Sequence, residues 1–472
     1  MPDPVARLNG LALVAPRITP VLDPQFRPAV LTNRAFRALA RAAGHPVPVS
    51  LVLEQADGSR SGFHTEVLPA DHPEAAGDFA YVERLLKFLL WSRGGYKIYF
   101  AGPRSIGEAL QRYYRETPTG MFDANVMGDR VYEQPFEVVV TRAEELPKER
   151  ASAAPLGRHL DGCRIGFDLG GSDRKVAAVV DGEVVFSEEI AWNPVPQKDP
   201  QYHVDGIQDS LTRAAGHLPR VDAIGGSAAG IYVNNRVKIA SLFRGIPPDV
   251  FKSRVRDLFL EVSRAWPGVP FDVVNDGEVT ALAGSMAMSE NAVLGVAMGT
   301  SQAAGYVTPE GNITTWLNEL AFVPVDYHPA AARDEWSGDI GCGALYFSQQ
   351  CVGRLLAPAG IEVDAAMPLP EKLNHVQVLM AAGDARARKI YETIGTYLGY
   401  TMAHYADFYD YRYLLLLGRV TTGTGGDVIL AGARAVLEAE FPELAGRVRF
   451  HTPGEKEKRH GQAIAAASLP SR

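Results

Sequence analysis

Hydrophobic and polar residues recur along this chain with the periods of amphipathic helices and short strands. In the first 150 residues, apolar positions spaced three and four apart predict helices over 31–43, 79–91 and 105–114. Apolar runs bounded by turn residues predict strands over 47–53, 62–68 and 96–101. An Asp57-Gly58 turn separates the first two strands. The pattern therefore predicts an α/β domain over residues 1–150, and no motif in it indicates a chemistry.

A charged, alanine-rich stretch over 142–159 has the composition of a linker. We place the linker at 151–160, a first lobe at 161–290 and a second lobe at 291–472. In these lobes the pattern predicts strands over 221–225, 271–274, 293–298 and 413–417 and helices over 250–266, 279–288, 385–408 and 428–440. Such alternation is typical of an α/β architecture with helices on both sheet faces.

Two segments, 165–180 and 293–307, resemble each other. Each contains a buried strand, a turn of small residues and a return strand. The similarity indicates two related lobes, each of which offers one phosphate-binding turn to a shared cleft.

Composition and charge exclude several classes of protein. The chain has 472 residues, of which 46% are hydrophobic and 22% are charged, as in ordinary globular proteins. A net charge of −8 argues against broad binding to nucleic acid or anionic membranes. No segment has the length of a membrane span or the form of a signal peptide, and the three cysteines show no CxxC spacing. We therefore expect a cytoplasmic protein without a nucleic-acid or membrane partner. Whether the chain forms a homo-oligomer stays open.

The first candidate site is the turn after strand residues 163–169. Asp168 stands near the end of this strand, and Gly170, Gly171 and Ser172 follow it. Adjacent glycines let backbone N–H groups approach an anion, because no Cβ blocks them. A carboxylate beside a phosphate is favourable when Mg²⁺ lies between them. Taken alone, the segment is equally typical of an ordinary hairpin with a Gly-Gly turn.

Three further candidates follow along the chain. Asn275 and Asp276 come at the end of a predicted strand, where they would form a catalytic pair or cap the next helix. The turn 299–301 (Gly-Thr-Ser) repeats the small-residue pattern, and a glycine-rich turn at 418–426 opens a helix. A dinucleotide-binding turn is disfavoured at 418–426, because the GxGxxG spacing is absent.

Together these segments resemble the ROK (repressor, open reading frame, kinase) sugar kinases of the actin/hexokinase/heat-shock-ATPase superfamily. IGFDLGGSDRKVAAVVDG resembles the first phosphate loop, and VVNDGEVTALAG resembles the catalytic-aspartate segment. VLGVAMGTSQAAGYV is similar to the second phosphate loop, and LLLLGRVTTGTGGDVILAGA to the adenosine loop. The four segments occur in the family's order over residues 163–472 and leave the first 150 residues outside.

The resemblance implies a two-lobed actin-like ATPase (ribonuclease H-like) fold with an added N-terminal α/β domain. It implies an ATP- and Mg²⁺-dependent kinase that phosphorylates a hydroxyl of a sugar, amino sugar or cyclitol. Asp276 would be the general base, Asn275, Asp276 and Glu319 would bind the acceptor, and Asp168 would organise the Mg²⁺ ion. The implied phosphate contacts are Gly170, Gly171, Ser172, Gly299, Thr300 and Ser301, and the implied nucleoside contacts are Gly423, Gly425 and Gly426.

The sequence departs from the family's pattern near the acceptor. Ala321 and Phe322 follow Glu319 where the family carries Gly-His, and the family's zinc loop is reduced to 338–343 with a single cysteine. Structural zinc needs about four nitrogen or sulfur ligands, and Cys342, Cys351 and His328 do not supply them. We therefore expect no zinc and an altered acceptor.

Two other functions stay open at this stage. One is a non-catalytic carbohydrate-sensing regulator, since the family includes repressors with an N-terminal winged helix-turn-helix. The strand pair, balanced charge and size of residues 1–150 fit such a domain poorly. The other is an ATPase that activates a protein partner and needs no sugar pocket.

Overall fold

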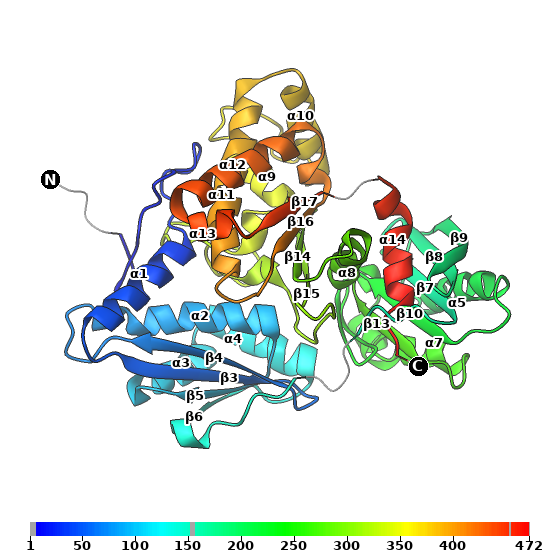
Figure 1. The fold of residues 1–472 in the computed structure, drawn as a ribbon, viewed down its shortest axis with the longest axis horizontal. Helices are drawn as coiled ribbons and strands as arrows, with labels where there is room; N and C mark the ends of the chain where they lie inside the picture. The colour runs from blue at the N-terminus through cyan, green and yellow to red at the C-terminus, as the bar shows by residue number, and fades with distance from the viewer. Residues whose placement is uncertain (1–5, 152–155, 453–454, 472) are drawn as a thin grey trace.

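The computed structural model describes residues 6–151, 156–452 and 455–471. Figure 1 shows an N-terminal part beside a second lobe, with the first lobe on the other side of helix α8 (Asp276–Met288). The α/β architecture predicted from the sequence is confirmed. The predicted domain boundaries stay a prediction, and residues 152–155 of the predicted linker lie outside the described residues.

The N-terminal part is built on a four-stranded sheet. Its strand order is β4 (Arg60–Val67), β3 (Val47–Glu54), β5 (Lys97–Ala101) and β6 (Glu137–Val140). Its helices are α1 (Ala29–Ala42), α2 (Asp78–Arg93), α3 (Arg104–Glu116) and α4 (Pro118–Asn125). The three predicted helices and three predicted strands of this region are confirmed, while α4 and β6 add to them.

Helix α2 is buried on nearly every side, although its apolar spacing predicted an amphipathic helix. It lies between the N-terminal sheet and the second lobe (Figure 1), and of its residues only Phe79 is partly exposed. A helix that is buried all round belongs to a core rather than to a surface. One continuous apolar cluster accordingly runs from Leu11 through α2 to Phe450.

The first lobe contains a five-stranded sheet. Its order is β13 (Phe271–Asn275), β10 (Ala223–Ala228), β7 (Cys163–Leu169), β8 (Asp173–Val180) and β9 (Glu183–Ala191). The first three strands are parallel, and β7, β8 and β9 form an antiparallel meander. Helix α5 (Gln201–Ala215) packs against β7 and β8, and α7 (Leu258–Arg264) packs against α5.

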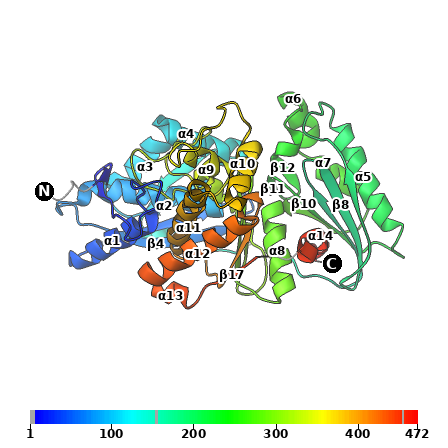
Figure 2. The same cartoon turned by 90° about the horizontal axis from the view of Figure 1, so that it is seen from above.

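Near the C-terminal end, helix α14 (Glu455–Ala467) returns to the first lobe and packs on β7 and β10 (Figure 2). Gly166 and Gly225 make this approach feasible. A Cβ atom at either position would collide with the carbonyl group of Ala463 or Ala466. The two glycines thus fix how closely α14 lies against the sheet.

The second lobe repeats part of this topology. Its strand order is β15 (Gln302–Val307), β14 (Val293–Met298), β16 (Tyr413–Leu417) and β17 (Arg449–His451). In both lobes a hairpin continues into two parallel strands beside its first strand. The similarity predicted between 165–180 and 293–307 is therefore found in the strand pairing.

Helix α8 follows β13 of the first lobe but packs on β14 and β15 of the second, so it connects the two sheets. Two long helices, α11 (Ala385–Tyr405) and α12 (Thr424–Glu440), pack on each other beside the second sheet. The remaining elements are β1 (Arg7–Leu8), β2 (Leu11–Ala12), β11 (Ile231–Val233), β12 (Arg236–Ile239), α6 (Pro248–Val250), α9 (Gln349–Leu355), α10 (Leu369–Ala381) and α13 (Pro442–Ala445).

The prediction of a single helix over 250–266 is wrong. The segment consists of α6, a π-helical turn over Phe251–Val255 and α7. The carbonyl oxygen of Arg256 accepts from the N–H of Val237 at 2.9 Å, which draws it towards β12. A tertiary hydrogen bond therefore interrupts a helix that the apolar spacing favours.

Among the described residues, no helix has both the length and the apolar character needed to cross a membrane.

Candidate active site

Asp168 lies near the end of β7, where the parallel strands of the first lobe finish. Its side chain is buried, and its Oδ1 accepts a hydrogen bond from Ser227 Oγ on β10 at 2.7 Å. Burial raises the pKa of Asp168, while the bond from Ser227 and the positive charge of Lys175 oppose the shift. No described residue donates to Oδ2 or forms an ion pair with this carboxylate, so one oxygen remains available for a ligand.

The turn after Asp168 is tight and open on its outer side. The N–H of Gly170 donates to Asp173 O at 2.9 Å and closes the turn. Gly171 and Ser172 are exposed, and a Cβ atom at Gly171 would meet nothing within 4 Å. The space in front of Gly171 can therefore receive an anion close to the backbone.

Asn275 and Asp276 stand where β13 passes into α8. The Asn275 Oδ1 accepts from the N–H of Gly277 at 2.7 Å and caps the helix, while its Nδ2 donates to Gly230 O at 2.6 Å. Asp276 is the first residue of α8 and is half-buried. Burial, together with the negative charge of Asp168, raises its pKa to about 6. The helix cap weighed for this pair is thus present, and it holds the carboxylate of Asp276 near that of Asp168.

Two further carboxyl groups extend this cluster. Burial and the charge of Asp276 raise the pKa of Glu319 to about 7. Burial raises the pKa of Glu278 to about 8; Asn318 Nδ2 and the N–H of Tyr306 donate to its carboxylate. The structure therefore brings Asp168, Asp276 and Glu319 into one electrostatic neighbourhood. Glu278 was not among the predicted site residues, although in the sequence it stands where the family's Asn-Asp-Ala-Asn run has its second Asn.

The second predicted phosphate turn connects β14 to β15. Gly299 donates to Ser301 O at 3.0 Å, and Thr300 and Ser301 are exposed. The next residue, Gln302, is buried; with its amide nitrogen towards the carbonyl groups, it donates to Leu320 O and Gly343 O, both at 3.2 Å. Gln302 thus connects this turn to the segment after Glu319. Among the described residues, no hydrogen bond or ion pair joins the 299–301 turn to the 170–172 turn.

The glycines predicted near a nucleoside differ in their surroundings. Gly423 has a φ of 67°, and a Cβ atom there would meet nothing within 4 Å. Gly425 and Gly426 are buried in the first turn of α12; a Cβ atom would collide with the ring of Tyr391 or with Thr421 O. Their small size is therefore required by packing, and of these three glycines only Gly423 faces open space.

Comparison with solved structures identifies the fold. A ROK hexokinase from Thermus thermophilus aligns with a TM-score of 0.50 at 18% identity, over 64% of this chain and 97% of that one. The fold is the ROK/actin-like ATPase fold. A ROK glucokinase from Streptomyces griseus, in complex with glucose and AMPPNP, gives 0.47 at 18% identity over 65% and 98% of the two chains. A ROK transcriptional regulator, a homologue of the E. coli MLC protein, gives 0.46 at 17% over 66% and 79%. No family model and no curated protein sequence matches the chain.

Within this ROK-like fold, Phe322 occupies the position where the family pattern has histidine. Its ring stacks on Trp91 of α2, with 4.1 Å between the ring centroids. The N–H groups of Asn318 and Glu319 donate to the carbonyl oxygens of Ser92 and Trp91, both at 2.9 Å. The end of α2 thus holds the segment that carries Glu319.

The loop that corresponds to the ROK zinc loop is also joined to α2. Arg84 Nη1 lies 3.0 Å and Lys87 Nζ 3.4 Å from the carboxylate of Asp339, and Lys87 Nζ lies 2.7 Å from Asp123. All four side chains are buried. Burial raises the pKa of the Cys342 thiol to about 12. Among the described residues, no group of three or more His, Cys, Asp or Glu is arranged to hold a metal. An ionic cluster from the N-terminal part therefore braces this loop.

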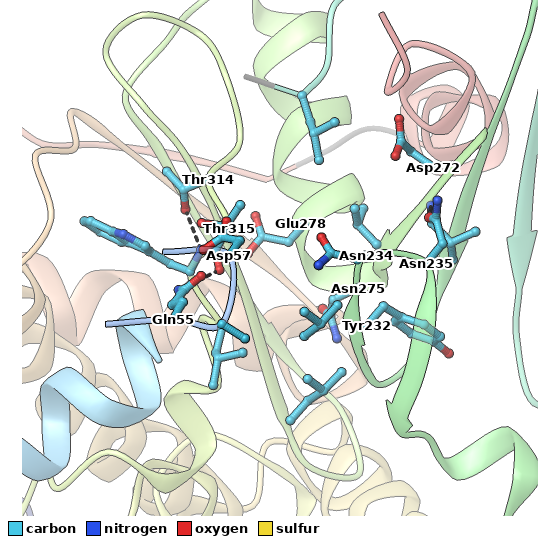
Figure 3. A pocket seen from close by; sticks show the side chains of 18 of the residues that line it. Gln55, Asp57, Tyr232, Asn234, Asn235, Asp272, Asn275, Glu278, Thr314 and Thr315 are labelled. Carbon is cyan, nitrogen blue, oxygen red and sulfur yellow. Dashed lines mark hydrogen bonds between the residues drawn. The ribbon is translucent and has the colours of Figure 1, made fainter. Parts of the chain in front are cut away.

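A cavity of about 140 Å³ lies beside Glu278, at one end of the carboxyl group cluster that also contains Asp168, Asp276 and Glu319. Its walls come from the β3–β4 turn, the β11–β12 hairpin, the start of α8 and the segment 314–317. In Figure 3, the side chains on one side are Gln55, Asp57, Thr314 and Thr315, and those on the other are Tyr232, Asn235 and Asp272. The Asp57-Gly58 turn predicted the hairpin but not its place here, because only the tertiary fold brings that turn to α8.

Proposed function

We propose that this protein is a kinase that transfers the γ-phosphate of ATP to a hydroxyl group of a sugar, amino sugar or cyclitol. The observation that carries the proposal is the position of Asp276. Its carboxylate begins α8, lies near Asp168 and Glu319, and has a pKa raised to about 6. A general base works best when its pKa lies close to the pH at which it operates.

The acceptor side of the reaction rests on Asp276 and Glu319. Asp276 accepts the proton of the attacking hydroxyl, and the Asn275 cap fixes where α8 begins and so orients this carboxylate. Glu319 accepts a hydrogen bond from a second hydroxyl of the acceptor. Orientation of this kind supplies a large part of the rate enhancement in phosphoryl transfer.

The nucleotide side rests on the two turns and on Asp168. The open face at Gly171 and the exposed Thr300 and Ser301 suit phosphate oxygens. The available Oδ2 of Asp168 suits Mg²⁺, which proteins commonly hold through one or two carboxylates besides substrate phosphates. Bound Mg·ATP supplies the phosphoryl group and neutralises its charge. Gly423 would border the nucleoside.

The test measures ADP release from Mg·ATP with a panel of sugars and cyclitols, using wild type and Asp276→Asn. We expect acceptor-dependent release that falls by about 10²- to 10⁴-fold in the variant, the usual contribution of a general base, while ATP still binds. Glu371→Gln is the control, because Glu371 lies exposed in the first turn of α10. Acceptor-dependent turnover that survives in Asp276→Asn would refute the assigned role.

The same assay separates the two alternatives. ADP release that no small acceptor stimulates would indicate an ATPase that acts on a protein partner. An absence of turnover, combined with DNA binding that a carbohydrate modulates, would indicate a regulator.

A further inference from the structure

The cavity beside α8 has a largely apolar lining in which acidic and neutral polar side chains are set. Among the described residues that line it, none is Lys, Arg or His, whereas Asp57, Asp272 and Glu278 all contribute. Figure 3 shows Asp57 and Glu278 on the side of Thr315, and Asp272 on the other side. The lining also offers hydroxyl and amide groups, which suit a polyhydroxy ligand.

The carboxylates next to the cavity have no basic partner. Among the described residues, none of Asp168, Asp276, Glu278 and Glu319 takes part in a salt bridge, although many other acidic side chains of the chain do. Buried carboxylates without a cation are costly. The proposed function supplies one cation to this group, the Mg²⁺ ion at Asp168. It supplies no cation near Glu278, at the other end of the group.

A second feature points to a ligand at the same place. Tyr132 lines the cavity and is 4% exposed, and its hydroxyl has no hydrogen-bond partner. Buried hydroxyl groups are normally bonded, so an unbonded one beside a cavity indicates a missing partner. Asp57 lies close enough to influence the Tyr132 hydroxyl electrostatically.

We propose that this cavity binds a protonated amino group on the acceptor, so that the acceptor is an amino sugar or aminocyclitol rather than a neutral or anionic polyol. This inference rests on the proposed kinase function and specifies its acceptor. The ammonium group lies between Asp57 and Glu278, and the hydroxyl that is phosphorylated lies at Asp276. The N-terminal part, through the β3–β4 turn, thereby selects the acceptor.

Among the described residues, the nearby cations do not pair with Asp57 or Glu278, and without a cation beside it Glu278 keeps its proton up to a pKa of about 8. Arg93 donates to Gly62 O at 2.6 Å and stacks on the ring of Trp316. Lys238 and Arg256 both pair with Glu133. Their charges are therefore engaged outside the cavity.

The test measures dissociation constants by calorimetry for wild-type protein with two matched pairs and one acid. The probes are glucosamine and glucose, an amino-inositol and myo-inositol, and glucuronate, each with Mg²⁺ and a non-hydrolysable ATP analogue. In at least one pair we expect the amine to bind about tenfold more tightly, the order of one charge-assisted contact, and glucuronate to bind more weakly than glucose.

Variants locate the effect. Asp57→Asn retains the acceptor for the Ser59 N–H at 2.9 Å, so the turn is preserved. We expect it to weaken amine binding several-fold and to leave binding of the neutral partner unchanged; Glu278→Gln should act in the same direction. Asp71→Asn, at an exposed position away from the cavity, is the control.

Three results would overturn the inference: no probe binds, each neutral polyol binds as tightly as its amine, or the preference survives unchanged in both variants. Failure of the proposed function looks different. Amine-selective binding that Asp57→Asn abolishes, without any ADP release from ATP, would leave the cavity's ligand in place and refute the kinase.

Discussion

The backbone N–H of Glu319 donates to the carbonyl oxygen of Trp91 at 2.9 Å, across 228 positions of sequence. The Trp91 indole also stacks on Phe322, three residues beyond Glu319. A residue of the N-terminal part thus positions the carboxyl group that is proposed to bind the acceptor.

Replacement of Trp91 should therefore affect both stability and acceptor binding. Trp91→Ala removes a side chain that is 1% exposed, and we expect the free energy of unfolding to fall by about 3–5 kcal/mol. KM for the acceptor should rise more than KM for ATP, because the disturbed segment carries Glu319. Urea unfolding and steady-state kinetics measure the two effects.

The matched control is Trp336→Ala, since Trp336 is 65% exposed. Its free energy of unfolding should change by less than about 0.5 kcal/mol. Equal changes in the two KM values of Trp91→Ala would argue against a positioning role.

The ionic cluster between α2 and the 338–343 loop predicts a large cost for loss of Lys87. Lys87→Met leaves Asp123 without its ammonium partner, and such a change typically costs about 3–5 kcal/mol. Lys97→Met breaks a more exposed pair with Glu137 and should cost less than about 1 kcal/mol. Chemical denaturation of the two variants at neutral pH compares them; equal losses would contradict the importance of the buried cluster.

Asp339 in the same cluster gives stability a dependence on acid. Burial alone would raise its pKa, but Arg84 and Lys87 hold it well below the ordinary value. A lowered carboxyl pKa stabilises the fold above the unfolded-state pKa, near 4, and the contribution is lost as the pH falls further. Asp339→Asn should therefore flatten the loss of stability below about pH 4. Urea unfolding measures this between about pH 2.5 and 5, in steps of about half a pH unit.

Glu278 predicts the opposite dependence nearer neutral pH. Its pKa of about 8 exceeds the unfolded value near 4.3, so the folded protein keeps a proton that the unfolded chain loses. The free energy of unfolding should decrease as pH rises between these values, by at most about 1.4 kcal/mol per unit for this group. Glu278→Gln should reduce the slope, whereas Glu362→Gln, at an exposed site, should not. An unchanged slope in Glu278→Gln would assign the effect to another group.

Two glycines distinguish ligand contact from packing. Gly171→Ala places its methyl group in open space, so stability should change by less than about 0.5 kcal/mol while ATP affinity falls. Gly425→Ala presses on the Tyr391 ring and should cost about 1–3 kcal/mol. Gly446→Ala, whose nearest atom would lie at 3.8 Å, is the control for both. Thermal unfolding and calorimetric ATP titration measure the effects; unchanged ATP affinity in Gly171→Ala would remove the 170–172 turn from the nucleotide site.

Local sequence patterns predicted the features that local chemistry determines. The turn after Asp168, the 299–301 turn and the cap at Asn275 each depend on residues within a few positions. Their order along the chain, which resembles that of the ROK family, was enough to predict the two-lobed fold. The proposed roles of these residues stay predictions.

Long-range features could not be predicted in this way. Arg84 contacts Asp339, 255 residues away, and no local pattern indicates so distant a partner. The break between the π-helical turn over Phe251–Val255 and α7 likewise coincides with a distant contact, the hydrogen bond from the N–H of Val237 to Arg256 O. In each case a tertiary contact decided between local structures that the sequence pattern left equivalent.

The burial of α2 also has a consequence in time. The helix ends at Arg93, but its second apolar wall includes Phe408, whose ring lies 3.8 Å from that of Phe88. At about 5–20 residues per second of synthesis, a ribosome needs roughly 15–60 s to make the intervening chain. Throughout that interval, Phe88 lacks the rings of His404, Tyr405 and Phe408 on which it packs in the folded protein. The nascent chain therefore exposes apolar surface of α2 during synthesis, and such surface favours aggregation.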